Sequence, residues 1–440
     1  MVTGLAAQVK QQNIIIYALF GMALLVAGGV RWWAAPISAG PDIAQFWAFA
    51  QVFHTHGIDF YRYAEATADI FPFKLWGYVY PPFWLLVLGI CLCFAPGAFA
   101  SDTAVDVAWR VAMKTPVIMA DLAIGCLIFW AVPGSKARKL LFAVLWLFHP
   151  TAWYQSAVFG QFDAVAAVFV VAALIMLVKQ REWIAFVMAG LAITVKQHAL
   201  IPVAGMIAAV VHTYRRTEFV QRCILLAAPL VILSIPFLLT GNLLEYAKSV
   251  FLPAQAAGYQ YPIDYAFSGT GSLLTYLHEA YGWETVNVIK ALPYVTGVAL
   301  AGVVFLCYRK RVHPLQAALA SFLAFTALFY RVNYQYMIIY IPVALLVASM
   351  SVHRGERVMT LVLALFPAVW MWLFNVSFWF FYLEPASRWV VPYLTNIGMG
   401  QRSAPEVYVI YAVILSLLSL VYVGLVFSRW RGWEREERAD

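Results

Sequence analysis

Two short stretches, Arg31-Trp32-Trp33 and Gly40-Pro41-Asp42-Ile43-Ala44-Gln45-Phe46-Trp47, decide how the rest of the chain is interpreted. The first ends an apolar run that begins at Ile14, which is long enough to span a membrane and has no small-residue cleavage site of a signal peptide. The second opens a polar and aromatic segment that continues to Tyr80, where a new apolar run starts. The pattern predicts a reaction loop at a membrane surface, with Asp42 close to the membrane exit.

The composition supports the membrane assignment for the whole chain. Of its 440 residues, 64% are hydrophobic and 11% are charged, which is typical of a polytopic membrane protein. No stretch of about 100 residues is polar enough to form a separate soluble domain, so residues 1–440 are expected to form one integral membrane domain. The five cysteines lie in apolar runs without metal-ligand spacing, and no dinucleotide or phosphate-binding loop motif is present. We therefore expect neither a metal nor a cofactor.

The fold class predicted from the apolar runs is an all-α bundle of about twelve transmembrane helices, with amphipathic helices in the outer loops. The runs centre on 14–33, 115–132, 140–158, 162–178, 183–198, 199–213, 223–240, 287–308, 314–330, 337–352, 357–380 and 405–428.

The distribution of Lys and Arg predicts the orientation of these helices. Basic residues collect at alternate connections and in the tail 429–440, which we place in the cytoplasm. The other connections, including the first outer loop 34–80 and the long outer loop 241–286, then share the outer face. The net charge of +8 belongs to the cytoplasmic loops, so it gives no reason to expect a nucleic-acid partner.

One segment does not fit the simple alternation. Residues 81–97 are apolar enough to enter the membrane, and a full crossing would reverse the orientation of everything that follows. We predict a short or re-entrant helix there, or an additional crossing within 99–114. Residues 99–114, which carry Arg110 and Lys114, are then expected to form an amphipathic helix on the membrane surface.

Asp42 is the strongest candidate for a chemical group. A carboxylate beside Phe46 and Trp47 near an apolar surface has a raised proton affinity, which a general base working near neutral pH requires. The alternative is a helix N-cap or loop residue. Asp59 and Asp69 are rival carboxylates, although Asp59 fits a turn that closes an amphipathic helix from Ile43 to His54.

Later polar clusters fall on the same predicted face. Lys196-Gln197-His198 and the segment 331–336 form two cationic corners that suit a phosphate group. Gln161 and Asp163 interrupt a helical pair beside them. Lys196 is alternatively a lysine that extends to the membrane surface, and Asp163 a helix N-cap. Two cationic corners and one carboxylate together predict transfer from a phosphate leaving group to a hydroxyl.

The motifs resemble those of a known family. Pro41-Asp42, Gly57-Ile58-Asp59-Phe60-Tyr61 and Tyr78-Val79-Tyr80-Pro81-Pro82-Phe83, followed by Lys114 to Leu122, His149-Pro150, Gly160-Gln161-Phe162-Asp163-Ala164 and Asn333-Tyr334-Gln335-Tyr336, are similar in order to GT-C fold glycosyltransferases that use polyprenyl-phosphate sugars. The similarity is greatest to the bacterial membrane mannosyltransferases of phosphatidylinositol mannoside synthesis, and it covers most of the first 340 residues.

The resemblance implies an inverting transferase in the bacterial plasma membrane, with its site on the periplasmic face. It would move a hexose, with mannose the first choice, from a polyprenyl-phosphate donor to a hydroxyl of a lipid or glycan acceptor. Asp42 would be the catalytic base, and Lys196, His198 and Arg331 would contact the donor phosphate. Asn333 stands where relatives often carry His, which puts more weight on those three cations. The expected substrate-binding residues are Tyr80, Gln161, Asp163, Gln197, Asn333, Tyr334 and Tyr336.

Two other classes of function remain open from the sequence. A secondary transporter or flippase of a lipid-linked or small anionic substrate predicts charges at mid-membrane and repeated, broken helices. A non-catalytic scaffold predicts that Asp42 is dispensable. The polar residues cluster toward one face and no internal repeat is visible, which favours the transferase.

Overall fold

The computed structural model describes residues 2–40, 42–64, 77–95, 99–101, 104–251, 267–374, 382–383 and 405–428. Almost all of these residues are helical. The α-helices are α1 (Val2–Ile37), α2 (Asp42–His56), α3 (Phe60–Tyr63), α4 (Pro82–Phe94), α5 (Val107–Ala131), α6 (Lys136–Leu147), α7 (Pro150–Trp153), α8 (Asp163–Val178), α9 (Glu182–Val195), α10 (Leu200–Val210), α11 (Arg216–Leu238), α12 (Leu243–Phe251), α14 (Thr270–Tyr281), α15 (Val286–Arg309), α16 (Pro314–Leu328), α17 (Met337–Met350), α18 (Arg354–Phe374) and α20 (Pro405–Ser428).

The strands are short and join distant parts of the chain. They are β1 (Ser38–Ala39), β2 (Phe99–Ser101), β3 (Ala104–Val105), β4 (Phe267–Ser268), β5 (Val332–Asn333) and β6 (Tyr382–Leu383). They form three antiparallel pairs, β1 with β6, β2 with β3, and β4 with β5. The pairing of β4 with β5 fixes the start of α14 beside the segment that follows α16.

The molecule is a multi-pass membrane protein. Five of the described helices are long and apolar enough to cross a membrane, namely those within 11–37, 107–131, 216–238, 286–309 and 409–428. Six shorter apolar helices lie within 82–94, 163–178, 182–195, 197–213, 314–328 and 337–350. A 16-residue helix is about 24 Å long, against about 30 Å for a bilayer core, so these helices depend on the rest of the bundle to lie in the membrane.

Burial separates central helices from peripheral ones. In α17 the residues from Met337 to Ser349 are buried on all sides, and α16 is buried nearly as completely. By contrast α1 and α15 expose large apolar side chains such as Leu25 and Val298. A helix that is apolar all round but exposed to the outside is stable only against lipid. The central helices therefore form the core, and the long outer helices face the membrane.

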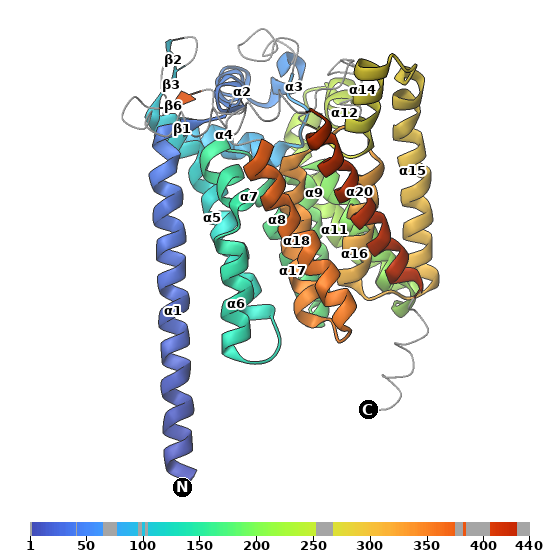
Figure 1. The fold of residues 1–440 in the computed structure, drawn as a ribbon. Helices are drawn as coiled ribbons and strands as arrows, with labels where there is room; N and C mark the ends of the chain where they lie inside the picture. Colours follow the sequence, from blue (N-terminus) through green and yellow to red (C-terminus); the bar gives the residue numbers. More distant parts are fainter. Residues whose placement is uncertain are drawn as a thin grey trace.

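The elements at one end of the bundle carry the predicted outer loops. Helices α2, α3, α12 and α14 gather at the end where α1 finishes, whereas the turns from α5 to α6 and from α17 to α18 lie at the opposite end (Figure 1). The predicted amphipathic helix from Ile43 to His54 is confirmed as α2, with Asp42 as its first residue. The tail 429–440 and Asp69 lie outside the described residues.

Two sequence-based expectations differ from the structure. The run 140–158 is not one helix, because α6 ends at Leu147 and is followed by α7 and a π-helical turn at Tyr154–Phe159. The amphipathic surface helix expected at 99–114 is wrong: Phe99–Ser101 and Ala104–Val105 form the β2–β3 pair, and both Arg110 and Lys114 are buried at the start of α5. Both side chains therefore lie inside the protein and do not face water.

The segment 81–97 does not reverse the orientation of the chain. Helix α4 has 13 residues, about 20 Å, which is too short to cross a bilayer alone. Lys114 near the start of α5 hydrogen-bonds Ser38 at the end of α1. The chain thus leaves α1 and enters α5 at the same end of the bundle, as the prediction of a short or re-entrant helix requires.

Candidate active site

Asp42 is held where the outer end of the bundle meets α2. A tight turn precedes it, in which the Ile43 N–H donates to the Gly40 carbonyl. The Gly40 N–H donates to the Phe159 carbonyl at 3.2 Å, and a Cβ at position 40 would lie 2.5 Å from the Phe159 ring. Only glycine allows this approach, so the residue two positions before Asp42 ties the loop to the π-helical turn.

A buried ion pair lies beside Asp42. Lys196, which follows the last turn of α9, places its Nζ 2.7 Å from Oδ2 of Asp163, the first residue of α8. Lys196 is 2% exposed and Asp163 is 0% exposed. His198 adds a weaker contact, with Nε2 3.4 Å from Asp163 Oδ1. A charge pair removed from water in this way needs close contact to be tolerated, and breaking it would leave an uncompensated buried charge.

Aromatic rings surround the Lys196 ammonium. Its Nζ lies 4.7 Å from the Phe162 ring centre and 5.5 Å from the ring centres of Tyr80 and Tyr336. These separations are within the range of cation–π attraction. The Tyr336 ring also lies 4.4 Å from the His198 ring. Segments before α4, before α8 and before α17 thus converge on one lysine.

The electrostatics of Asp42 follow from this surrounding. Burial raises the pKa of Asp42 from 3.8 to about 7, the Lys196 charge lowers it, and the Asp163 charge raises it. Residue Asp42 is partly exposed, whereas Lys196 and Asp163 are buried. A carboxyl with this pKa changes between acid and base near neutral pH, which is what general base catalysis requires.

Tyr80 and Tyr336, the two tyrosines beside Lys196, stay protonated. Burial raises the pKa of Tyr80 well above its ordinary value, and the charges of Asp42 and Asp163 raise it further. Burial likewise raises the pKa of Tyr336. Both rings are partly exposed, so each offers a neutral hydroxyl and an aromatic face next to the carboxylates.

Arg331, three residues after the end of α16 at Leu328, belongs to the same cluster of side chains. Its charge interacts with Tyr336 and Tyr80, and the guanidinium is partly exposed. Arg331 is thus a further basic side chain, besides Lys196 and His198, in this group. The cluster therefore combines two carboxyls, Asp42 and Asp163, with these three basic side chains.

The remaining predicted residues have different surroundings. Gln197 donates from Nε2 to the Val79 carbonyl at 2.8 Å, so it fixes the backbone next to Tyr80. Gln161 is fully buried, and neither polar atom of its amide has a hydrogen-bond partner among the described residues. Asn333 pairs with Phe267 in the β4–β5 pair. The Tyr334 side chain lies outside the described part of the chain.

Some contacts in the cluster could not be read from the sequence. The pairing of Lys196 with Asp163 joins residues 33 positions apart, and the sequence pattern did not predict that they form an ion pair. Phe162 was not singled out, although its ring is the nearest of the three to Lys196. The rival carboxylate Asp59 accepts a hydrogen bond from Asn242 at 3.0 Å, which gives it a structural role.

Comparisons with known proteins identify the family of the chain. Residues 78–330, more than half of the chain, match the model of Glycosyltransferase family 87. No curated protein sequence matches the chain. The solved structures include a crystal structure of ArnT from Cupriavidus metallidurans bound to undecaprenyl phosphate, with 12% identity, a TM-score of 0.46, and coverage of 96% of this chain and 77% of that one. That likeness is too distant to define the fold or the site here. By the extent of its family match, the chain belongs to glycosyltransferase family 87.

Proposed function

We propose that this glycosyltransferase moves a hexose, with mannose the first choice, from a polyprenyl-phosphate donor to a hydroxyl of a lipid or glycan acceptor, with inversion at the anomeric carbon. The observation that carries the proposal is the position of Asp42, whose pKa burial raises to about 7: it interacts with the charges of Lys196 and Asp163, and its own charge acts on Tyr80. Membership of a glycosyltransferase family favours this reading over a transporter, a flippase or a scaffold.

In the proposed reaction Asp42 accepts the proton of the acceptor hydroxyl. The hydroxyl oxygen then attacks the anomeric carbon, a new C–O bond forms on the side opposite the donor phosphate, and the bond from the anomeric carbon to the phosphate oxygen breaks. The electron pair of that bond leaves with the polyprenyl phosphate. A phosphate leaving group needs no general acid, so one ionised carboxyl is sufficient.

The departing phosphate gains negative charge, and positive side chains next to it lower the barrier. In this proposal Arg331, Lys196 and His198 contact the phosphate, and Lys196 and His198 would share their donors between Asp163 and the phosphate. The hydroxyls and rings of Tyr80 and Tyr336 would contact the sugar, and the unpartnered amide of Gln161 fits a hydrogen bond to a sugar hydroxyl. Gln197 would act through the backbone at Val79.

We further propose that about twelve helical segments cross or enter the bilayer and that the site faces the outer side. The support is that the turns at the end of the bundle away from α2 carry lysine and arginine, such as Arg138 and Arg354. A test is a His54→Cys variant, because His54 is exposed on α2. A membrane-impermeant thiol reagent should label it in intact cells, and labelling only after lysis would reverse the orientation.

The central experiment measures sugar transfer directly. Membranes that contain the protein are given radiolabelled polyprenyl-phosphate mannose and a lipid extract as acceptor, and label in the acceptor lipids is counted. Asp42→Asn should reduce transfer by about 10²-fold or more, since it keeps the shape of the side chain and removes the base. Asp59→Asn is the matched control and should transfer at the wild-type rate. Wild-type transfer by Asp42→Asn would refute the proposed base.

A further inference from the structure

The outer end of α1 is fastened to α5 at two levels. At the first level, Arg31 Nε lies 2.6 Å from Asp121 Oδ2. At the second level, Lys114 Nζ donates to the carbonyl oxygens of Ala35 at 3.1 Å and Ser38 at 2.5 Å. Arg31 and Ser38 are seven residues apart, and so are Lys114 and Asp121, which corresponds to about two helical turns or about 10 Å. The antiparallel helices therefore keep one register over this distance.

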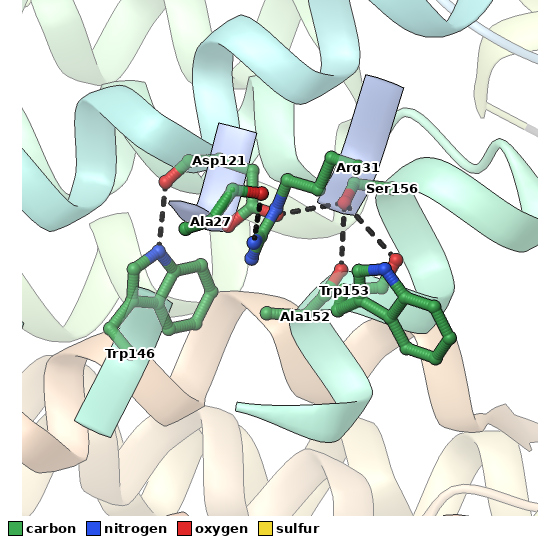
Figure 2. Close-up of polar contacts among 7 residues, drawn as sticks. All are labelled: Ala27, Arg31, Asp121, Trp146, Ala152, Trp153 and Ser156. Carbon is green, nitrogen blue, oxygen red and sulfur yellow. Dashed lines mark hydrogen bonds and ion pairs between the residues drawn. The ribbon is translucent and has the colours of Figure 1, made fainter. Parts of the chain in front are cut away.

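The first level is a buried network (Figure 2). Asp121 Oδ2 also accepts a hydrogen bond from Ser156 Oγ at 2.7 Å, and the Asp121 carbonyl accepts one from Trp146 Nε1 at 2.8 Å. Arg31 and Asp121 are each 1% exposed. Because neither charge reaches water, separating them is costly. The network thereby joins α1, α5, α6 and the π-helical turn into one rigid unit.

The contacts at the second level supply hydrogen-bond donors to carbonyl groups at the end of α1. The last carbonyls of a helix have no partner within the helix, and the helix dipole places negative charge there. Lys114 supplies hydrogen-bond donors to the Ala35 carbonyl in the last turn of α1 and to the Ser38 carbonyl just after it, and it also contacts Ser38 Oγ at 3.3 Å. Ser38 Oγ in turn donates to the Ala34 carbonyl at 2.7 Å. Lys114 is 0% exposed, so this contact uses the whole side chain.

The same stretch of α5 also holds the chain on the other side of Asp42. Trp109 Nε1 donates to the Ile43 carbonyl at 3.0 Å. Lys114 thus binds the backbone four residues before Asp42, and Trp109 binds it one residue after. The turn between these two points is short, so the place where α2 begins depends on α5.

We propose that Lys114 is a positioning residue for the transfer reaction, which by binding the last carbonyls of α1 sets the place of Asp42 beside Lys196 and Asp163. The proposal rests on the proposed role of Asp42 as the base. Lys114 touches no reacting group itself and acts only through the backbone. A displacement of the base by about 1 Å can lower the rate about 10²-fold, so the contact matters for turnover even if the bundle still folds.

The test is Lys114→Met, which keeps the length of the side chain and removes the hydrogen-bond donors of the amino group. The rate constant kcat for transfer from polyprenyl-phosphate mannose should fall about 10- to 100-fold per folded molecule, while KM for that donor stays within about twofold, because the donor contacts are on other helices. The acid limb of the pH–rate profile should also move to lower pH, because a displaced Asp42 is better hydrated.

A matched control removes the same kind of contact elsewhere. Lys310 Nζ donates to the Phe427 carbonyl at 2.5 Å at the end of α20, at the end of the bundle away from α2. Lys310→Met should leave kcat and the acid limb unchanged. If Lys114→Met lowers only the amount of folded protein and the surviving molecules keep wild-type kcat and pH profile, the positioning role is overturned.

A milder variant decides the question if Lys114→Met does not fold. Lys114→Gln keeps a hydrogen-bond donor but is one atom shorter, so it weakens the contact with the Ala35 and Ser38 carbonyls and should lower kcat about threefold or more at constant KM; a wild-type kcat overturns the proposal. Asp42→Asn separates the two hypotheses. If Asp42→Asn keeps full activity, the proposed base fails, whereas an inactive Asp42→Asn together with a fully active Lys114→Met removes only the role of Lys114.

Discussion

The rate of transfer should fall steeply below neutral pH, because the proposed base must be ionised to accept a proton. The pKa of Asp42 is raised from 3.8 to about 7. The ionised fraction is then about 0.9 at pH 8 and about 0.01 at pH 5, so kcat/KM should fall about 90-fold over this interval. A carboxyl that kept the pKa of 3.8 would lose only about 6% of its ionised form over the same interval.

The assay is transfer from radiolabelled polyprenyl-phosphate mannose between pH 5 and pH 8.5 at constant ionic strength. The donor is a phosphodiester and does not titrate in this range, so an acid limb belongs to the protein. A sample returned from pH 5 to pH 8 must recover its rate, which separates titration from unfolding.

The charges around Asp42 predict how the limb moves. Lys196 lowers the pKa of Asp42 and Asp163 raises it. Lys196→Met should therefore move the limb to higher pH, and Asp163→Asn should move it to lower pH. A rate that stays constant from pH 8 to pH 5 would refute the reasoning. So would a limb that disappears in His198→Gln, because the titrating group would then be the histidine.

Three further predictions concern stability. Lys196→Met removes the lysine that pairs with the buried Asp163 and should destabilise the protein by about 3–5 kcal/mol. The double variant Lys196→Met with Asp163→Asn should regain most of the melting temperature but not the transfer activity. A Lys196→Met variant that melts like wild type would contradict the pairing. Gly160→Ala should lower the melting temperature more than Gly134→Ala. Both glycines have a positive φ, but of the two only position 160 would place a Cβ 2.3 Å from a side chain. An equal loss of melting temperature in the two variants would contradict this prediction. Asp42→Asn should raise the melting temperature most at pH 8, because the raised pKa of Asp42 means that ionisation of its carboxyl disfavours the fold. This gain in melting temperature should shrink as the pH falls through 7 toward 3.8. A gain that is the same at every pH would show that ionisation is not the cause.

The sequence predicted the membrane class and much of the proposed site. Long apolar runs exclude a soluble protein, and the expected helix from Ile43 to His54 is present as α2. Asp42, Lys196 and Arg331 lie in segments far apart along the chain, yet each was placed on one face from the alternation of basic loops. In the structure Asp42 interacts with the charge of Lys196, and Tyr80 interacts with the charges of both Asp42 and Arg331. Their roles in transfer stay predictions.

Other features were decided only by tertiary packing. A pattern of charges at 99–114 is typical of a surface helix, because an isolated lysine or arginine is unfavourable in an apolar interior. Lys114 is nevertheless buried, since the end of α1 offers carbonyl oxygens that only the folded bundle brings to it. The same holds for Lys196 with Asp163 and for Arg31 with Asp121, whose partners are 33 and 90 residues away. Hydropathy and charge along the chain determined which segments enter the membrane and which face they meet; which buried charge binds which partner depended on distances that exist only after the helices pack.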